Sequence, residues 1–145
     1  MTGPDFLDTN VAIYAFDTSH PEKQKVSRAL LKSAIAGKAI ISRQVLAEFS
    51  AALLHKISPR VSADAVAKGL DALAPIRTIL PDVDLIRRAV EAHASYGIHF
   101  YEGMIVAAAE RAGCERIWSE ELSDGQEHFG VTVANLFRDE FQGIK

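Results

Sequence analysis

An aspartate, Asp8, stands where a short apolar segment gives way to a helical pattern that begins at Thr9. In an open parallel sheet, ligands bind beyond the carboxyl ends of the strands, so Asp8 is predicted to stand at the functional edge of such a sheet. Thr9 and Asn10 are predicted to brace its carboxylate. The same position also suits a simple helix N-cap, in which Asp8 or Thr9 accepts a hydrogen bond from a free helix N–H group.

Two glutamates occupy helical patterns further along the chain. Glu48 has Val45 at i−3 and Ala52 at i+4, which places its carboxylate near the inward face of a helix. Glu102 heads an almost wholly apolar helix, where the helix dipole best supports negative charge. Each has a plain alternative, because most helical glutamates are solvated and a first-turn acid can serve the dipole alone.

A fourth acidic segment, IWSEELSDGQ at residues 117–126, runs from an apolar strand into a polar turn. Its acids again fall just beyond the carboxyl end of a predicted strand. Asp and Gly also build turns for purely local reasons, so this segment by itself is unremarkable.

The four segments together predict a cation site. Carboxylates that converge on one sheet edge repel each other and need a cation to hold them there. Mg²⁺ and Mn²⁺ suit such a site because these hard ions prefer oxygen ligands. A pair of such ions can stabilise both the attacking and the leaving oxygen of a phosphodiester, so the constellation predicts a metal-dependent phosphodiester hydrolase.

The elements that must position these acids alternate along the chain. Short apolar runs followed by longer helical patterns are typical of an α/β fold with a mostly parallel sheet. Strands are predicted at residues 5–7, 38–42, 76–80, 115–119 and 131–135. Helices are predicted at residues 9–16, 21–36, 43–57, 62–73, 82–96 and 102–112, and the last of these is expected to be buried.

The bulk properties fit one domain over residues 1–145. The chain is 48% hydrophobic and 24% charged, with no repeat or low-complexity segment, which is typical of one compact fold. We expect no secretory signal and no membrane span, and therefore a cytoplasmic protein. The single cysteine, Cys114, is interpreted as a small structural residue.

The motifs FLDTN, Glu48, FYEGMIVAAAERAGC and IWSEELSDGQ followed by GVTVAN resemble the PIN-domain family. The pattern is most similar to that of the VapC-type toxins of bacterial and archaeal toxin–antitoxin pairs. This resemblance implies a three-layer α/β/α sandwich with a mostly parallel central sheet. It also implies an endoribonuclease that uses Mg²⁺ or Mn²⁺ to hydrolyse single-stranded or looped RNA.

The resemblance also implies which residues form the site. Metal ligands carried over by position are Asp8, Glu48 and Glu102, with Glu121 as the fourth acid and with Ser119 and Asp124 as supporting residues. Glu102 and Glu121 stand where the family usually has aspartate. Because the charge is kept, we expect an active enzyme. The family further implies a homodimer and a cognate antitoxin, whose extended C-terminal segment would lie in an apolar groove and block the site.

A net charge of −3 would ordinarily count against a nucleic-acid partner. Setting the four site acids aside leaves 15 acids against 16 Lys and Arg, so bound metal ions would remove most of this objection. Candidates for phosphate contacts are Lys23, Lys25, Arg28, Lys32, Arg43, Lys56 and Arg60, although a solvated helix face is the expectation for each of them taken singly. Phe100 and Tyr101 could stack a base, but core packing is the expectation for both.

Other classes fit less well. The five histidines show no zinc-ligand spacing, which disfavours a zinc hydrolase. A receiver domain would need an adjacent acidic pair after the first strand and a lysine after the last, and a haloacid-type phosphatase would need an aspartate where Asn10 stands. The serious alternative is a catalytically inactive PIN-fold module that holds a protein or RNA. Metal-dependent turnover separates it from an enzyme.

Overall fold

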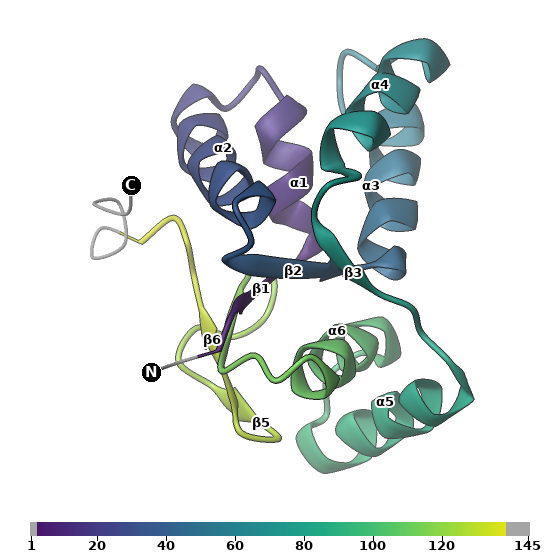
Figure 1. The fold of residues 1–145 in the computed structure, drawn as a ribbon, viewed down its shortest axis with the longest axis vertical. Helices are drawn as coiled ribbons and strands as arrows, with labels where there is room; N and C mark the ends of the chain where they lie inside the picture. Colours follow the sequence, from purple (N-terminus) through teal and green to yellow (C-terminus); the bar gives the residue numbers. More distant parts are fainter. Residues whose placement is uncertain (1–2, 139–145) are drawn as a thin grey trace.

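The computed structural model describes residues 3–138. A six-stranded sheet has the strand order β3-β2-β1-β4-β6-β5, and every neighbouring pair is parallel except β5 and β6. Figure 1 shows α1 to α4 on one side of this sheet and α5 and α6 on the other, so the predicted three-layer α/β/α sandwich is confirmed. The elements are β1 (Asp5–Leu7), α1 (Thr9–Phe16), α2 (Pro21–Ile35), β2 (Ala39–Ser42), α3 (Arg43–His55), α4 (Ala63–Leu73), β3 (Arg77–Ile79), α5 (Val83–Tyr96), α6 (Phe100–Arg111), β4 (Arg116–Trp118), β5 (Glu127–His128) and β6 (Val131–Ala134).

The strand order creates a switch point between β1 and β4. From β1 the chain moves outward through β2 to β3, and it then returns to place β4 on the opposite side of β1. The parallel strands all end at the same edge, and ligands of open α/β sheets bind beyond that edge where the order reverses. Asp8 follows β1 and Ser119 follows β4, so the two predicted site residues flank the switch point.

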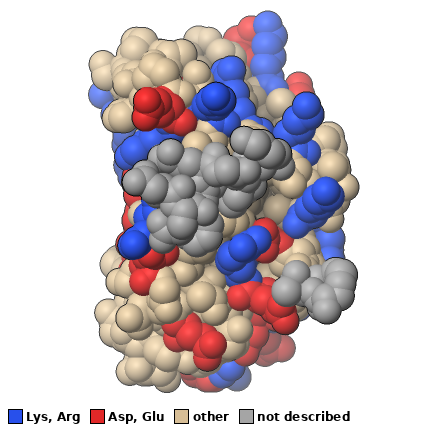
Figure 2. All heavy atoms as spheres, turned by 90° about the vertical axis from the view of Figure 1, so that its left-hand side faces the viewer, with Lys and Arg blue, Asp and Glu red and all other residues tan. Residues whose placement is uncertain are grey.

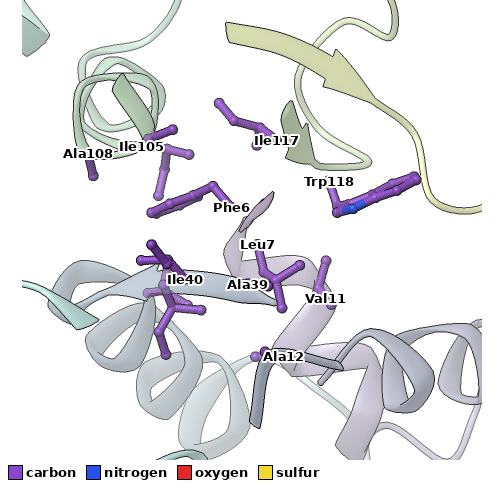
Figure 3. Packing of buried hydrophobic residues seen from close by; sticks show 14 of the residues in the cluster. Phe6, Leu7, Val11, Ala12, Ala39, Ile40, Ile105, Ala108, Ile117 and Trp118 are labelled. Atoms are coloured by element: carbon purple, nitrogen blue, oxygen red, sulfur yellow. The ribbon is translucent and has the colours of Figure 1, made fainter. Parts of the chain in front are cut away.

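Adjacent residues of β1 bind the two helical layers to the sheet. Phe6 and Leu7 are both buried and point to opposite faces, as successive strand residues must. Figure 3 shows Phe6 among Ile105, Ala108 and Ile117, whereas Leu7 lies near Val11. The strand that carries Asp8 is therefore fixed by packing on both of its faces.

The helix α6 is buried from Gly103 to Ala109, as its apolar sequence predicts. It packs closely against α5. A Cβ atom at Gly103 would lie 2.6 Å from the carbonyl oxygen of Ala89, so only glycine allows this approach. Because Gly103 directly follows Glu102, this close contact with α5 also fixes the position of the Glu102 backbone.

Two local features differ from the prediction. The helix α6 begins at Phe100, two residues before the predicted start, because the His99 side chain caps it. The strand β5 was not predicted, since it is a two-residue antiparallel extension that turns back through Phe129 and Gly130, both at positive φ. The other helix and strand boundaries lie within two residues of the predicted ones.

Two further expectations concern single features. Cys114 is buried, and burial raises the pKa of its thiol to about 11, which fits the predicted structural role. No helix in residues 3–138 is both long and apolar enough to cross a membrane.

Candidate active site

A cavity of about 310 Å³ lies beyond the carboxyl ends of the strands. All four predicted site acids line it, although they come from four separate segments. Its lining residues are Asp8, Glu48, His99, Tyr101, Glu102, Ile105 and Glu121. The structure thus brings together acids that are up to 113 positions apart in the sequence.

Asp8 is the buried member of this set, with a relative exposure of 6%. Its Oδ1 accepts a hydrogen bond from the Thr9 backbone N–H at 2.7 Å, and its Oδ2 accepts one from the Ser119 hydroxyl at 2.7 Å. The pKa of Asp8 is raised to about 6, mainly because the carboxylate is buried. The two hydrogen bonds oppose this shift, and the nearby Glu121 and Glu48 carboxylates add to it. The residue is both the N-cap of α1 and a cavity carboxylate, so the two interpretations of its position coexist.

Glu48 is held from two sides. The Thr9 hydroxyl donates to its Oε1 at 2.6 Å, and the Gln44 amide donates to its Oε2 at 3.3 Å. The side chain of Thr9 therefore braces Glu48, whereas its backbone N–H braces Asp8. Gln44 also donates to the Tyr101 carbonyl oxygen at 3.0 Å, which links α3 to the start of α6.

Glu102 belongs to the cap of α6. Its Oε1 accepts a hydrogen bond from the His99 backbone N–H at 2.8 Å, and the His99 ring Nδ1 accepts one from the Tyr101 backbone N–H at 3.1 Å. These reciprocal bonds form a capping box. A helix-terminal role for Glu102 is therefore present in the structure alongside its place in the cavity wall.

The segment after β4 is organised by Ser119, which is fully buried. Its hydroxyl oxygen accepts hydrogen bonds from the backbone N–H groups of Glu121 and Leu122, each at 3.1 Å, while it donates to Asp8. Partial desolvation raises the pKa of Glu121, and repulsion from Glu48, Glu102 and Glu120 adds to the shift.

Two predicted supporting residues act elsewhere than expected. The side chain of Asn10 accepts a hydrogen bond from the Glu120 backbone N–H at 3.2 Å, so it holds the segment after β4 and does not brace Asp8 as predicted. Asp124 accepts a hydrogen bond from the Asn135 backbone N–H at 2.8 Å and forms an ion pair with Arg138 at 2.8 Å. It ties this segment to the end of β6, and it is not among the lining residues of the cavity.

Glu120 and Glu121 are neighbours with different surroundings. The carboxylate of Glu120 accepts a hydrogen bond from the Tyr14 hydroxyl at 2.7 Å and pairs with the Lys23 ammonium group at 2.5 Å. The carboxylate of Glu121 lines the cavity. The sequence left open which acid of this segment belongs to the site, and the resemblance pointed to Glu121.

The predicted phosphate-binding lysines and arginines are spread over different surfaces. Figure 2 shows that Lys and Arg gather over the upper part of the face on the α2 side. The lower part consists mostly of uncharged residues, with some Asp and Glu. The helix α1 packs between α2 and α3, so the basic helix α2 is separated from Glu48 (Figure 1). Lys56 follows α3, and its charge reaches the cavity because it opposes the upward pKa shift of Glu121.

Of the two aromatic residues before Glu102, one packs as predicted and the other does not. Phe100 packs against the core as expected, but Tyr101 has a relative exposure of 55% and lines the cavity together with His99. The reason lies in the start of α6. With the cap at His99, Phe100 turns inward, and the next residue is rotated by about 100° around the helix.

The donor set suits a hard divalent cation. The four acids contribute carboxylate oxygens, and the strongest charge effects on Asp8 and Glu121 come from other carboxylates. In the described part of the chain, no group of three or more His, Cys, Asp or Glu side chains is arranged so that it could hold a metal ion. Glu48 and Glu102 line the cavity, and each accepts hydrogen bonds from neighbouring groups of the protein.

A family model described as PIN domain matches residues 6–121. The matched part contains all four cavity acids and ends at Glu121, before β5 and β6. No curated protein matches the chain.

Proposed function

The chain belongs to the PIN domain family, a family of metal-dependent nucleases, and on this premise we propose that it is an Mg²⁺- or Mn²⁺-dependent endoribonuclease. The observation that carries the proposal is that Asp8, Glu48, Glu102 and Glu121 line one cavity at the switch point of the sheet. Desolvation is the main cause of the raised pKa values of Asp8 and Glu121, and repulsion from neighbouring carboxylates adds to both shifts, so a bound cation would stabilise the charged forms.

We propose that these four acids hold the ions. Such ions, when bound, polarise the phosphodiester and activate a water molecule. Asp8 presents a carboxylate that the Thr9 amide and the Ser119 hydroxyl keep in one orientation. Because Oε1 of Glu102 caps α6, we propose its Oε2 as the ligand atom.

The proposal is tested by cleavage of a single-stranded RNA in Mg²⁺, in Mn²⁺, and in excess EDTA. We expect turnover only with the ions. A Glu48→Gln variant, purified in the same way, controls for contaminating ribonuclease and is expected to be inactive. Asp64→Asn is the matched control, since Asp64 is an exposed acid on α4, and it is expected to cleave like the wild type. Full activity in EDTA would refute the proposal.

We further propose that the nuclease is the toxin of a type II toxin–antitoxin pair, a single cytoplasmic domain that forms a homodimer.

An apolar stripe on α5 supports the dimer. Val83, Ile86 and Val90 lie on one face of this helix and are 41–65% exposed, and Leu80, shortly before the helix, is 60% exposed. If the protein sediments as a monomer at a concentration of tens of micromolar, that result would count against the dimer. An adjacent small gene that encodes a DNA-binding antitoxin would support the toxin assignment.

An inactive binding module is the second candidate. It is favoured by one observation, which is that Glu102 already serves as a helix cap while no three acids are arranged around an ion in residues 3–138. The two candidates differ in metal-dependent turnover, and RNA that is bound but never cleaved would favour the module.

A further inference from the structure

The cavity has an aromatic wall as well as an acidic one. The rings of His99 and Tyr101 stack at an interplanar angle of 23°, with their centroids 5.7 Å apart. Both side chains are exposed, and both line the cavity that holds the four acids. Tyr101 is exposed by 55% next to charged groups, although a tyrosine of the core would be largely buried.

Hydrogen bonds to the Tyr101 backbone and a contact with the Phe100 ring hold the His99–Tyr101 pair in place. The Tyr101 N–H is bonded to the His99 ring, and the Tyr101 carbonyl oxygen accepts a hydrogen bond from Gln44. The Phe100 ring meets the Tyr101 ring edge-on, at 68° and 5.2 Å, and Phe100 itself packs against the core. A surface that is already ordered loses little conformational entropy when a ligand binds to it.

The chemistry of the cavity limits what such a surface can bind. Without bound ions, the four carboxylates repel the phosphates of a nucleic acid, so under that condition attraction near this cavity has to come in part from groups without charge. An unpaired base offers a flat π face to an aromatic side chain, whereas the bases of a duplex are already stacked on one another.

We propose that the His99–Tyr101 pair is the stacking site for one unpaired base of single-stranded RNA, next to the acid cavity. This inference rests on the proposed function, because it names how the same site selects its substrate. Stacking tolerates every base, so the pair selects unpaired strands and contributes little to sequence preference.

Binding, not cleavage, tests the inference. The affinity of a fluorescein-labelled single-stranded RNA is measured by anisotropy in EDTA for the wild type, Tyr101→Ala, Tyr101→Phe and Tyr101→Trp. Loss of a stacking ring weakens binding by about 5- to 150-fold, so we expect Tyr101→Ala to lie in that range. The two aromatic variants are expected to stay within about 2-fold of the wild type, since they keep the ring.

Two comparisons serve as controls. Ile35→Ala removes an exposed apolar side chain from the end of α2 and is expected to bind like the wild type. A blunt duplex of the same sequence is expected to bind more weakly than the single strand, and with no difference between wild type and Tyr101→Ala.

Three results would overturn the inference: wild-type affinity in Tyr101→Ala, an equal loss in Tyr101→Phe, or no preference of the wild type for the single strand. Its failure is distinguishable from failure of the proposed function. A ring-dependent affinity without metal-dependent cleavage would sustain the stacking site and refute the nuclease, whereas cleavage that is unaffected by loss of the ring would do the reverse.

Discussion

The two halves of the cavity are built differently. In the half at β1 and β4, Asp8 and Ser119 are buried, and Asp8 is fixed there by a hydrogen bond from Ser119 and by a strand packed on both faces. The half at the start of α6 is exposed, and Glu102 is held there by a helix cap. The sheet therefore supplies a buried carboxylate that accepts two hydrogen bonds, while the helix end supplies a less buried one that caps its own helix.

The largest effect is expected at the buried half. Asp8→Asn should lower RNA cleavage by about 1000-fold, which corresponds to about 4 kcal/mol, because an amide is a poor ligand for a hard cation. The thermal midpoint in EDTA should stay unchanged or rise, since burial raises the pKa of Asp8 and the charged form therefore costs stability at neutral pH. A large loss of stability together with unchanged cleavage would identify Asp8 as a structural cap only.

The packing beneath the exposed half gives the next effect. Gly103→Ala should destabilise the fold by about 1–3 kcal/mol, because the new Cβ would meet the backbone of α5 at 2.6 Å. Gly69→Ala is the matched control: its Cβ would meet side-chain ring atoms, at 3.2 Å or more, which can shift. Thermal melts that rank Gly69→Ala as the more damaging substitution would contradict this description of the α5–α6 contact.

Ser119 connects Asp8 to the segment that carries Glu121. Ser119→Ala removes one hydrogen bond to a carboxylate and leaves two backbone N–H groups without their acceptor. Residues that orient a metal ligand typically contribute about 10- to 100-fold in metal affinity or activity, and we expect a loss in that range. Ser50→Ala, on α3, is a control expected to leave the kinetics unchanged. Equal kinetics in all three proteins would show that Asp8 does not need this support.

The smallest contrast is between two neighbouring acids. Glu121→Gln should lower cleavage by about 10-fold, because Glu121 lines the cavity. Glu120→Gln should change cleavage by less than about 2-fold and stability by less than about 1 kcal/mol, because its partner Lys23 is partly exposed and solvent screens the pair. A larger loss of cleavage in Glu120→Gln than in Glu121→Gln would show that Glu120, and not Glu121, belongs to the site.

The difference between the halves also explains which site residues could be placed from the sequence alone. Asp8 lies directly after a strand, and the neighbouring parallel strands fix where that residue goes, so its place could be predicted. The exposure of Tyr101 could not, because it depends on α6 starting at Phe100, and this start depends on a histidine cap that the usual N-cap preferences do not include. The position of Asp124 could not be predicted either, because it is set by contacts with Asn135 and Arg138, which follow β6 and lie more than ten positions away in the sequence.

The central claim is that both halves hold the same ions. It is tested most directly by calorimetric Mn²⁺ titration of the wild type, Asp8→Asn and Glu102→Gln, with Asp64→Asn as the control. Glutamine at the third position of the helix still forms a capping box, so Glu102→Gln removes the charge while it keeps the cap. We predict that Asp8→Asn and Glu102→Gln each weaken Mn²⁺ binding by at least about 10-fold. Wild-type affinity in Glu102→Gln would contradict the claim, because the exposed half would then be a helix cap and not part of the metal site.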